Sequence, residues 1–102
     1  MKVEWTDEAL RHLQAIVDYI SEDSPDRAFD FAAKIESKAL RLGHFPQSGR
    51  IVPEWQDASI IFREIVVDNY RLIYRIRKQT VEITTVYHGM RQLSSTPLKN
   101  RL

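Results

Sequence analysis

Length, composition and charge describe a small single-domain protein and exclude several classes of site. The chain has 102 residues, 43% of them hydrophobic and 28% charged, which is ordinary for one globular domain over residues 1–102. It has no cysteine, so disulfides, thiolate metal sites and cysteine nucleophiles are excluded. The first ten residues include acids and no apolar run long enough for a signal peptide or membrane span, so we expect a soluble, cytoplasmic protein.

Charge is distributed unevenly along the chain. Residues 1–50 carry a balance of −2 and residues 51–102 a balance of +3, although the whole chain is only +1. From Asn69 onward, Glu82 is the single acid, and such polarity predicts an anionic partner, either nucleic acid or an acidic protein segment. A solvated basic surface is the alternative interpretation. The basic residues of this part are Arg71, Arg75, Arg77, Lys78, Arg91, Lys99 and Arg101.

The first half of the chain predicts a short strand followed by two helices. Residues 2–5 alternate as a strand, and Thr6 then offers a hydroxyl that can cap a helix over residues 7–22. A second helix starts at Pro25, where a missing amide costs nothing, and stops before Gly43. So short a link predicts an antiparallel hairpin with one joint apolar face. That face comprises Leu10, Leu13, Ile16, Val17, Ile20, Ala28, Phe31, Ala32, Ile35, Ala39 and Leu42.

The second half predicts a sheet that the hairpin can cover. Residues 44–59 are rich in turn formers yet keep large apolar side chains, which is typical of an ordered loop. Three runs rich in Ile, Val, Tyr and Thr follow over residues 60–91, with polar breaks at 68–69 and 78–80 that fit hairpin turns. The expected fold is therefore α+β, with a short N-terminal strand, a two-helix antiparallel hairpin and a three-stranded antiparallel meander whose one face the helices cover. Residues 92–102 are expected to form a short helix or a flexible arm.

Alternation along the second and third runs of the meander sorts their side chains onto two faces. The face expected to meet the helices carries Leu72, Tyr74, Ile76, Val81, Ile83, Thr85 and Tyr87. The face expected to stay open carries Arg71, Ile73, Arg75, Arg77, Glu82, Thr84, Val86 and His88. Several guanidinium groups on an open face suit an anionic ligand, whereas the alternative is that each arginine is a surface residue bridged to a neighbour such as Glu64 or Glu82.

The remaining motifs favour no metal, cofactor or nucleophile. The three histidines, His12, His44 and His88, have no ligand-like spacing, and neither a nucleophile-elbow sequence nor a phosphate-cradling glycine loop is present. We therefore expect no metal and no cofactor. A basic face with tyrosine and histidine beside it suits either RNA cleavage, in which cations stabilise charge developing on a phosphate, or simple binding of an acidic surface.

Four segments give the chain a family resemblance. They are Pro46-Gln47-Ser48-Gly49-Arg50, Phe62-Arg63-Glu64-Ile65, Asn69-Tyr70-Arg71-Leu72-Ile73-Tyr74-Arg75 and Val86-Tyr87-His88-Gly89-Met90-Arg91. With the order strand, two helices, meander, the chain resembles the RelE/ParE superfamily of type II toxin–antitoxin toxins, and the ParE branch most closely. The resemblance implies a toxin that a small antitoxin neutralises by wrapping it. One subset of the superfamily cleaves mRNA at the ribosome, and the ParE type inhibits DNA gyrase.

The match to the cleaving subset is partial. Arg71 matches its strand arginine and Arg91 its arginine after the last strand, with His88 as a proton-transfer candidate. The lysine cluster is missing, because residues 53–57 read Pro-Glu-Trp-Gln-Asp, and so is the C-terminal tyrosine, because residues 94–98 read Ser-Ser-Thr-Pro-Leu. Fewer cations would meet a phosphate, so the resemblance favours a gyrase inhibitor without an active site. The alternatives are a ribosome-dependent mRNA endonuclease and an inactive homologue that acts only in an antitoxin complex.

The resemblance also implies two interaction surfaces and their partners. DNA gyrase is the expected target, with ribosome and mRNA as the alternative, and a ParD-like antitoxin is the expected partner. The antitoxin is expected to cover apolar surface on the hairpin, at Leu13, Ile20, Phe31 and Ile35, and on the nearby sheet edge. The target is expected to contact Arg63, Arg71, Arg75, Arg77, His88, Arg91, Lys99 and Arg101. A structural role in this branch is the alternative for Arg63, Arg71 and Arg91.

Overall fold

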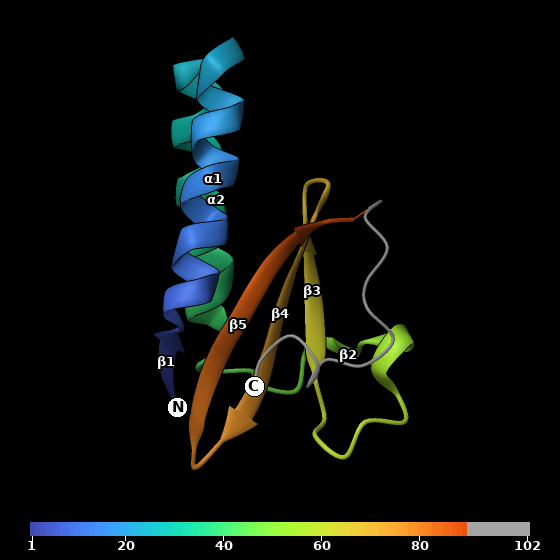
Figure 1. Cartoon of the computed structure of the whole chain (residues 1–102). Helices are drawn as coiled ribbons and strands as arrows, with labels where there is room; N and C mark the ends of the chain where they lie inside the picture. Colours follow the sequence, from blue (N-terminus) through green and yellow to red (C-terminus); the bar gives the residue numbers. More distant parts are fainter. Residues whose placement is uncertain (90–102) are drawn as a thin grey trace.

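A helical hairpin packed on one face of a five-stranded sheet makes up the protein (Figure 1). The computed structural model describes residues 1–89. The sheet has the order β1-β5-β4-β3-β2, in which β1 runs parallel to β5 and the other neighbours are antiparallel. The elements are β1 (Lys2–Trp5), α1 (Asp7–Asp23), α2 (Pro25–Arg41), β2 (Arg50–Ile51), a short 3-10 helix η1 (Pro53–Trp55), β3 (Arg63–Val67), β4 (Tyr70–Arg77) and β5 (Thr80–His88).

The α+β prediction is confirmed, with one strand more than expected. The two-residue strand β2 arises from the predicted loop and pairs with the start of β3. Both turns of the meander contain left-handed residues: Asp68 has φ 54°, and Lys78 and Gln79 have φ 49° and 59°. Two successive positive φ values between paired strands are the geometry of a two-residue hairpin loop. The prediction for residues 92–102 lies outside the described residues.

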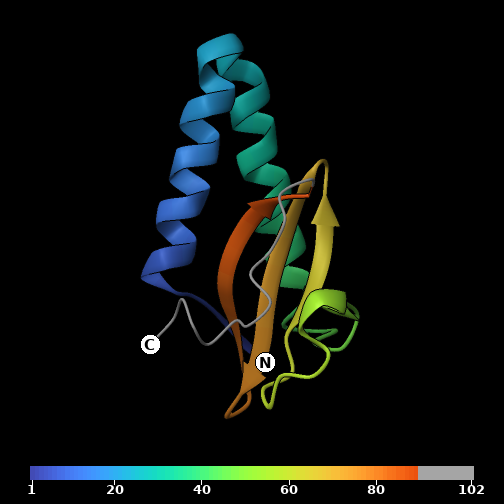
Figure 2. The ribbon, with the colours of Figure 1, turned by 45° about the vertical axis from the view of Figure 1, so that its right-hand side comes forward.

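The helices begin where their capping residues stand. The Thr6 hydroxyl accepts a hydrogen bond from the Ala9 amide at 3.0 Å, and the Ser24 hydroxyl accepts one from the Arg27 amide at 3.2 Å. Each bond satisfies an amide that has no partner inside its helix. The hairpin extends beyond the end of the sheet, as Figures 1 and 2 both show. Within the described part of the chain, no helix is long and apolar enough to cross a membrane.

Two apolar clusters lie on opposite faces of the sheet. The first joins the hairpin to β3, β4 and β5, and the second joins segment 52–62 to the other face of the sheet at Ile73. That face is therefore covered where it was predicted to be open. The first cluster contains Ala9, Phe31, Ile35, Ala39, Leu42, Val67, Leu72, Tyr74, Val81, Ile83 and Val86. The second contains Val52, Trp55, Phe62 and Ile73.

A β-bulge at Thr84 reverses the alternation of β5. Ile73 pairs with Thr85 and Tyr74 with Ile83, so Thr84 has no opposite residue in β4. The extra residue moves every later side chain to the other face. The predicted faces are therefore right for Val81 and Ile83 and wrong from Thr85 onward. Val86 belongs to the helix-side core, and Tyr87 packs against the second cluster.

On β4 the predicted faces are right, and the differences from the prediction concern exposure. Leu72 and Tyr74 are fully buried under the helices, as predicted. Ile76 is 36% exposed, because it lies near the end of the strand. Arg71 is only 7% exposed, because segment 52–62 crosses the face on which it lies.

Candidate functional site: an arginine network and a groove

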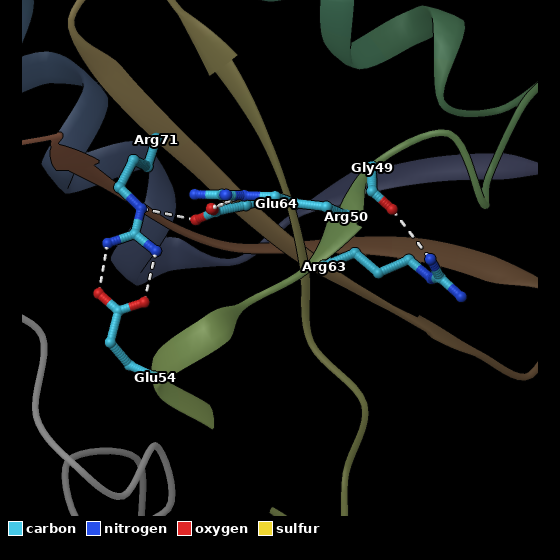
Figure 3. Close-up of polar contacts among 6 residues, drawn as sticks. All are labelled: Gly49, Arg50, Glu54, Arg63, Glu64 and Arg71. Atoms are coloured by element: carbon cyan, nitrogen blue, oxygen red, sulfur yellow. Dashed lines mark hydrogen bonds and ion pairs between the residues drawn. The ribbon is translucent and has the colours of Figure 1, made fainter. Parts of the chain in front are cut away.

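Arg71 on the central strand β4 is held by two carboxylates. Its Nη1 and Nη2 donate to the two oxygens of Glu54 at 2.7 and 2.8 Å, and its Nε donates to Glu64 at 2.6 Å (Figure 3). The paired bonds to Glu54 have the fork geometry in which a guanidinium binds a carboxylate or phosphate most strongly. Of the arginine side chain, 8% is exposed. Arg71 is thus a held cation and not a free one.

Glu64 links Arg71 to a second arginine. Its other oxygen accepts a hydrogen bond from Arg50 Nε at 2.6 Å, and none of its side chain is exposed. A buried carboxylate is tolerated only where cations and hydrogen bonds compensate it, and here two guanidinium groups do so. We call Arg50, Glu54, Glu64 and Arg71 the arginine network. It holds two positive and two negative groups, so it adds no net charge to the surface.

The segment that carries Glu54 is anchored by packing. Trp55 is 4% exposed and meets Phe62 edge to face at a ring separation of 5.3 Å. This contact holds η1 over the sheet, so the neighbouring Glu54 lies against Arg71. Hydrogen bonding to Arg71 lowers the pKa of Glu54, and bonding to Glu54 raises the pKa of Arg71 in turn. Both groups are therefore charged at neutral pH.

Arg63 serves a different contact on the helix-facing side of the sheet. It lies opposite Tyr74 in the β3–β4 pairing and donates to the carbonyl of Gly49 at 2.9 Å, pointing away from the arginine network in Figure 3. The Gly49 amide donates to the Tyr74 hydroxyl at 2.9 Å, and this hydroxyl donates to the Pro46 carbonyl at 2.8 Å. Burial raises the pKa of Tyr74. These bonds fix the loop before β2 to the middle of the sheet.

The other predicted target residues are dispersed. Arg75 donates to Glu82 at 2.8 Å, and Arg77 lies 3.8 Å from the same carboxylate near the β4–β5 turn. His88 pairs opposite Tyr70, with the rings 5.3 Å apart, on the helix side of the sheet. The structure therefore places His88 and Arg71 on opposite faces, and the two do not form one site. The predicted contributions of Arg91, Lys99 and Arg101 lie outside the described residues.

A groove of about 760 Å³ separates the projecting hairpin from the end of the sheet. Its floor is apolar and aromatic, from Ile20, Phe31 and Tyr70, and Tyr19 stands at its rim with 68% of the residue exposed. An ion pair of 2.8 Å between Lys34 and Asp68 bridges the hairpin to the β3–β4 turn. The lining residues are Tyr19, Ile20, Asp23, Arg27, Asp30, Phe31, Lys34, Asp68, Asn69, Tyr70 and His88.

The predicted antitoxin residues divide into two kinds. Leu13 and Ile20 are only partly buried, so a partner can still contact them. Phe31 and Ile35 are 4% and 0% exposed and belong to the core, so a partner reaches little of either while the hairpin stays on the sheet.

Sequence reasoning missed Glu54 and the groove. From the sequence, Glu54 counts only as a position without the lysine of the RNA-cleaving subset. The signal in the sequence is an acid that can pair with a strand arginine, as Glu54 does with Arg71. The groove depends on how far the hairpin projects beyond the sheet, and no local pattern encodes that distance.

Solved structures of toxin–antitoxin systems share this fold. The chromosomal ParDE system of P. aeruginosa matches with a TM-score of 0.67 at 21% identity, covering 86% of this chain and 95% of that one. The intact RelBE complex of E. coli matches with a TM-score of 0.54 at 16% identity, covering 88% and 98%.

The sequence also matches two relatives and one protein family. Protein Y4kP of Sinorhizobium fredii is 35% identical over 91 residues, covering 89% of this chain and 91% of the relative. Toxin RelE2 of Caulobacter vibrioides is 34% identical over 91 residues, covering 88% and 97%. Residues 3–93 match the family described as ParE toxin of the type II toxin–antitoxin system parDE. The chain therefore belongs to the ParE toxin family of type II toxin–antitoxin systems.

Proposed function

We propose that this chain inhibits DNA gyrase by binding it and does not cleave RNA. The arginine network carries the proposal. Arg71 matches the strand arginine of the RNA-cleaving subset. Its Nε donates to Glu64, and both of its terminal nitrogens donate to Glu54. A cleaving site needs cations aimed at the charge that develops on the phosphate, and a charge-balanced network does not supply them. The match to the ParE family over residues 3–93 supports the same choice.

A ribosome-dependent mRNA endonuclease is the second candidate. One relative at 34% identity bears the name toxin RelE2, which favours it. In that case Arg71 would have to leave Glu54 and meet the scissile phosphate, and Arg91 is the second arginine that the resemblance assigns to this role. His88 would reach the phosphate only after a rearrangement of β5, because it lies against Tyr70 on the opposite face of the sheet.

An antitoxin that binds in the groove between the hairpin and the sheet is the partner we propose. Ile20 and Tyr70 supply partly buried apolar surface there, and Tyr19 supplies exposed aromatic surface. A segment that is disordered alone can wrap such a small domain and spread its affinity over a large area. The mixed charges around the rim, three aspartates with Arg27 and Lys34, suit a partner segment with charges of both signs.

Two matched substitutions test this docking site. Tyr19→Glu places a charge in the groove and should reduce co-purification with the antitoxin encoded by a neighbouring short reading frame. Phe29→Glu is the control, since Phe29 is 75% exposed on α2 and is not among the lining residues. Equal retention of the antitoxin by both variants would place the contact elsewhere.

The order in which DNA synthesis and protein synthesis stop in the cell tests which target the chain has. A short pulse of expression without antitoxin should stop thymidine incorporation before methionine incorporation, because gyrase inhibition blocks DNA synthesis first. Early loss of methionine incorporation with mRNA cut in the ribosomal A site would favour the endonuclease. Undiminished growth would favour an inactive homologue, and both of these outcomes contradict the proposal.

A further inference from the structure

The strand β3 is only partly covered by the short strand β2. β2 pairs with the first two residues of β3, so within residues 1–89 no strand lies on that side of residues 65–67. The Val52 amide donates to the Phe62 carbonyl at 2.9 Å, so this carbonyl points toward β2. Backbone groups point the same way at every second residue of a strand, so the N–H and C=O of Val66 point to this side too, past the end of β2. They form an edge to which another strand can bond.

A hollow of about 350 Å³ lies beside this edge, between β3 and the last turn of α2. Its apolar lining comes from Leu42, Phe45, Ile65 and Val66. Phe45 is 57% exposed and Val66 is 61% exposed, so both can contact a partner. Among the described residues, the hollow shares no lining residue with the groove of about 760 Å³. The two are therefore separate surfaces.

The lining that the structure describes for this hollow includes two cations and no acid. Lys38 and Arg41 lie one turn apart on α2, and neither forms an ion pair within residues 1–89. The Arg41 guanidinium lies 5.6 Å from the centre of the Phe45 ring, which holds it beside the hollow. Both cations also complement the dipole at the end of α2, an interaction that leaves their N–H donors available to a ligand. The charge of the hollow therefore suits an acidic ligand.

We propose that the edge of β3 at Val66 binds an extended, acidic segment of a partner protein as an added antiparallel strand. The segment pairs its backbone with the N–H and C=O of Val66, in the row that β2 begins. Side chains alternate along a strand, so acids at every second position reach Lys38 and Arg41 on the hairpin side. The apolar residues between them pack on the Val66 side chain, which lies on the other face, opposite Arg71. This inference goes beyond the proposed function and does not depend on whether gyrase or the ribosome is the target.

Two other occupants fit this edge less well. A second copy of the chain, paired edge to edge, would bring its own Lys38 and Arg41 to the same row, and like charges repel. A nucleic acid would offer phosphate oxygens to the two cations, but these oxygens cannot donate to the Val66 carbonyl. A peptide backbone supplies both the donor and the acceptor that Val66 needs.

Titration of the full chain with a synthetic peptide tests the inference. The probe is a strand-length peptide of alternating Glu and Val with blocked ends, and the readout is the backbone amide resonances of the chain in NMR. Binding should shift the Val66 amide and protect it from hydrogen exchange. The same peptide with Lys in place of Glu should bind at least about tenfold more weakly.

Matched variants test the contribution of the two cations. Lys38→Gln combined with Arg41→Gln should weaken binding of the acidic peptide at least about fivefold. Arg11→Gln combined with Lys78→Gln is the control, because it changes the net charge equally at exposed positions outside the hollow. Equal affinity in the two double variants would overturn the proposal.

Methylation of the peptide backbone tests strand addition on the unchanged protein. In an antiparallel pair, the residue opposite Val66 is a valine of the peptide, and its N–H donates to the Val66 carbonyl. Methylation of the valine amides should therefore abolish binding, whereas methylation of the glutamate amides, which point away from β3, should not. Equal binding of the two methylated peptides would overturn the proposal. So would displacement of the peptide by a short DNA or RNA oligonucleotide that binds the wild-type chain more tightly.

Discussion

Glu54 and Arg71 are joined by two parallel hydrogen bonds, of 2.7 and 2.8 Å, that tie the short helix η1 to the central strand of the sheet. A third bond, from Arg71 to the buried Glu64, completes the hold on the guanidinium. Arg71, which the sequence predicts to bind an anionic ligand such as nucleic acid, instead holds the covering segment in place through Glu54. The Glu54–Arg71 pair therefore stabilises the fold and also supports a function in binding over one in RNA cleavage.

Loss of Glu64 should destabilise the fold strongly. Glu64→Gln leaves Arg71 and Arg50 without their shared buried carboxylate, and breaking a buried pair from one side costs about 3–5 kcal/mol. Urea unfolding of the purified chain measures the change. Asp68→Asn is the control, since the Lys34–Asp68 pair is about half exposed and should contribute less than about 1 kcal/mol. Equal costs for the two substitutions would show that the arginine network does not stabilise the fold.

Acid should weaken the tie between Glu54 and Arg71. The pKa of Glu54 is lowered from 4.5 by its hydrogen bond to Arg71, so its ionised form stabilises the fold above pH 4.5. That contribution is lost as the pH falls through the lower pKa of the folded state. The stability difference between wild type and Glu54→Gln should therefore be constant above pH 4.5 and shrink below it. Thermal melting across this range measures the difference, and a gap that widens with acid would contradict the assignment.

The Tyr74 hydroxyl should stabilise the loop before β2. Tyr74→Phe removes the acceptor of the Gly49 amide and the donor to the Pro46 carbonyl, and leaving buried polar groups unpaired costs about 1–3 kcal/mol. Tyr19→Phe makes the same chemical change at a residue that is 68% exposed and should change the free energy of unfolding by less than about 0.5 kcal/mol. Chemical unfolding of both variants gives the comparison. Equal changes in the free energy of unfolding of the two variants would show that the Tyr74 hydroxyl does not stabilise the loop.

Much of the fold could be predicted because its signals are local. Thr6, Ser24 and Pro25 mark helix starts by capping chemistry that needs no distant residue. The polar break at residues 78–80 marks a turn, in which Lys78 and Gln79 take positive φ values. Alternation also assigned Leu72 and Tyr74 correctly to the helix side. Each of these inferences depends on residues within one element.

What failed depends on contacts between elements. A bulge at Thr84 leaves no mark in a run of β-formers, yet one extra residue moves Val86 and His88 to the helix side of the sheet. The Thr6 hydroxyl donates to the Thr84 carbonyl at 3.1 Å, so a residue far away in the sequence supports the bulge. Coverage of Arg71 likewise depends on Trp55 and the path of its segment. The predicted site residues stay a prediction, and their distribution over both faces of the sheet depends on such contacts between elements.

Arg77 offers a test of the predicted target surface that spares the arginine network. Its side chain is 55% exposed near the β4–β5 turn, and its contact with Glu82 is long, at 3.8 Å. Arg77→Glu should therefore leave the fold intact. If the basic end of this hairpin contacts gyrase, the reversal of charge should weaken inhibition by about tenfold or more. Arg11→Glu, at an exposed position of α1, is the control. Equal inhibition by both variants would move the contact to another surface.

Supercoiling by purified DNA gyrase tests the proposed function most directly. Relaxed plasmid, ATP and gyrase are titrated with the full chain, alone and after addition of the antitoxin. The proposed function predicts inhibition at a small molar excess of the chain, and no inhibition when the antitoxin is added first. Full supercoiling at a large molar excess of folded chain would contradict it.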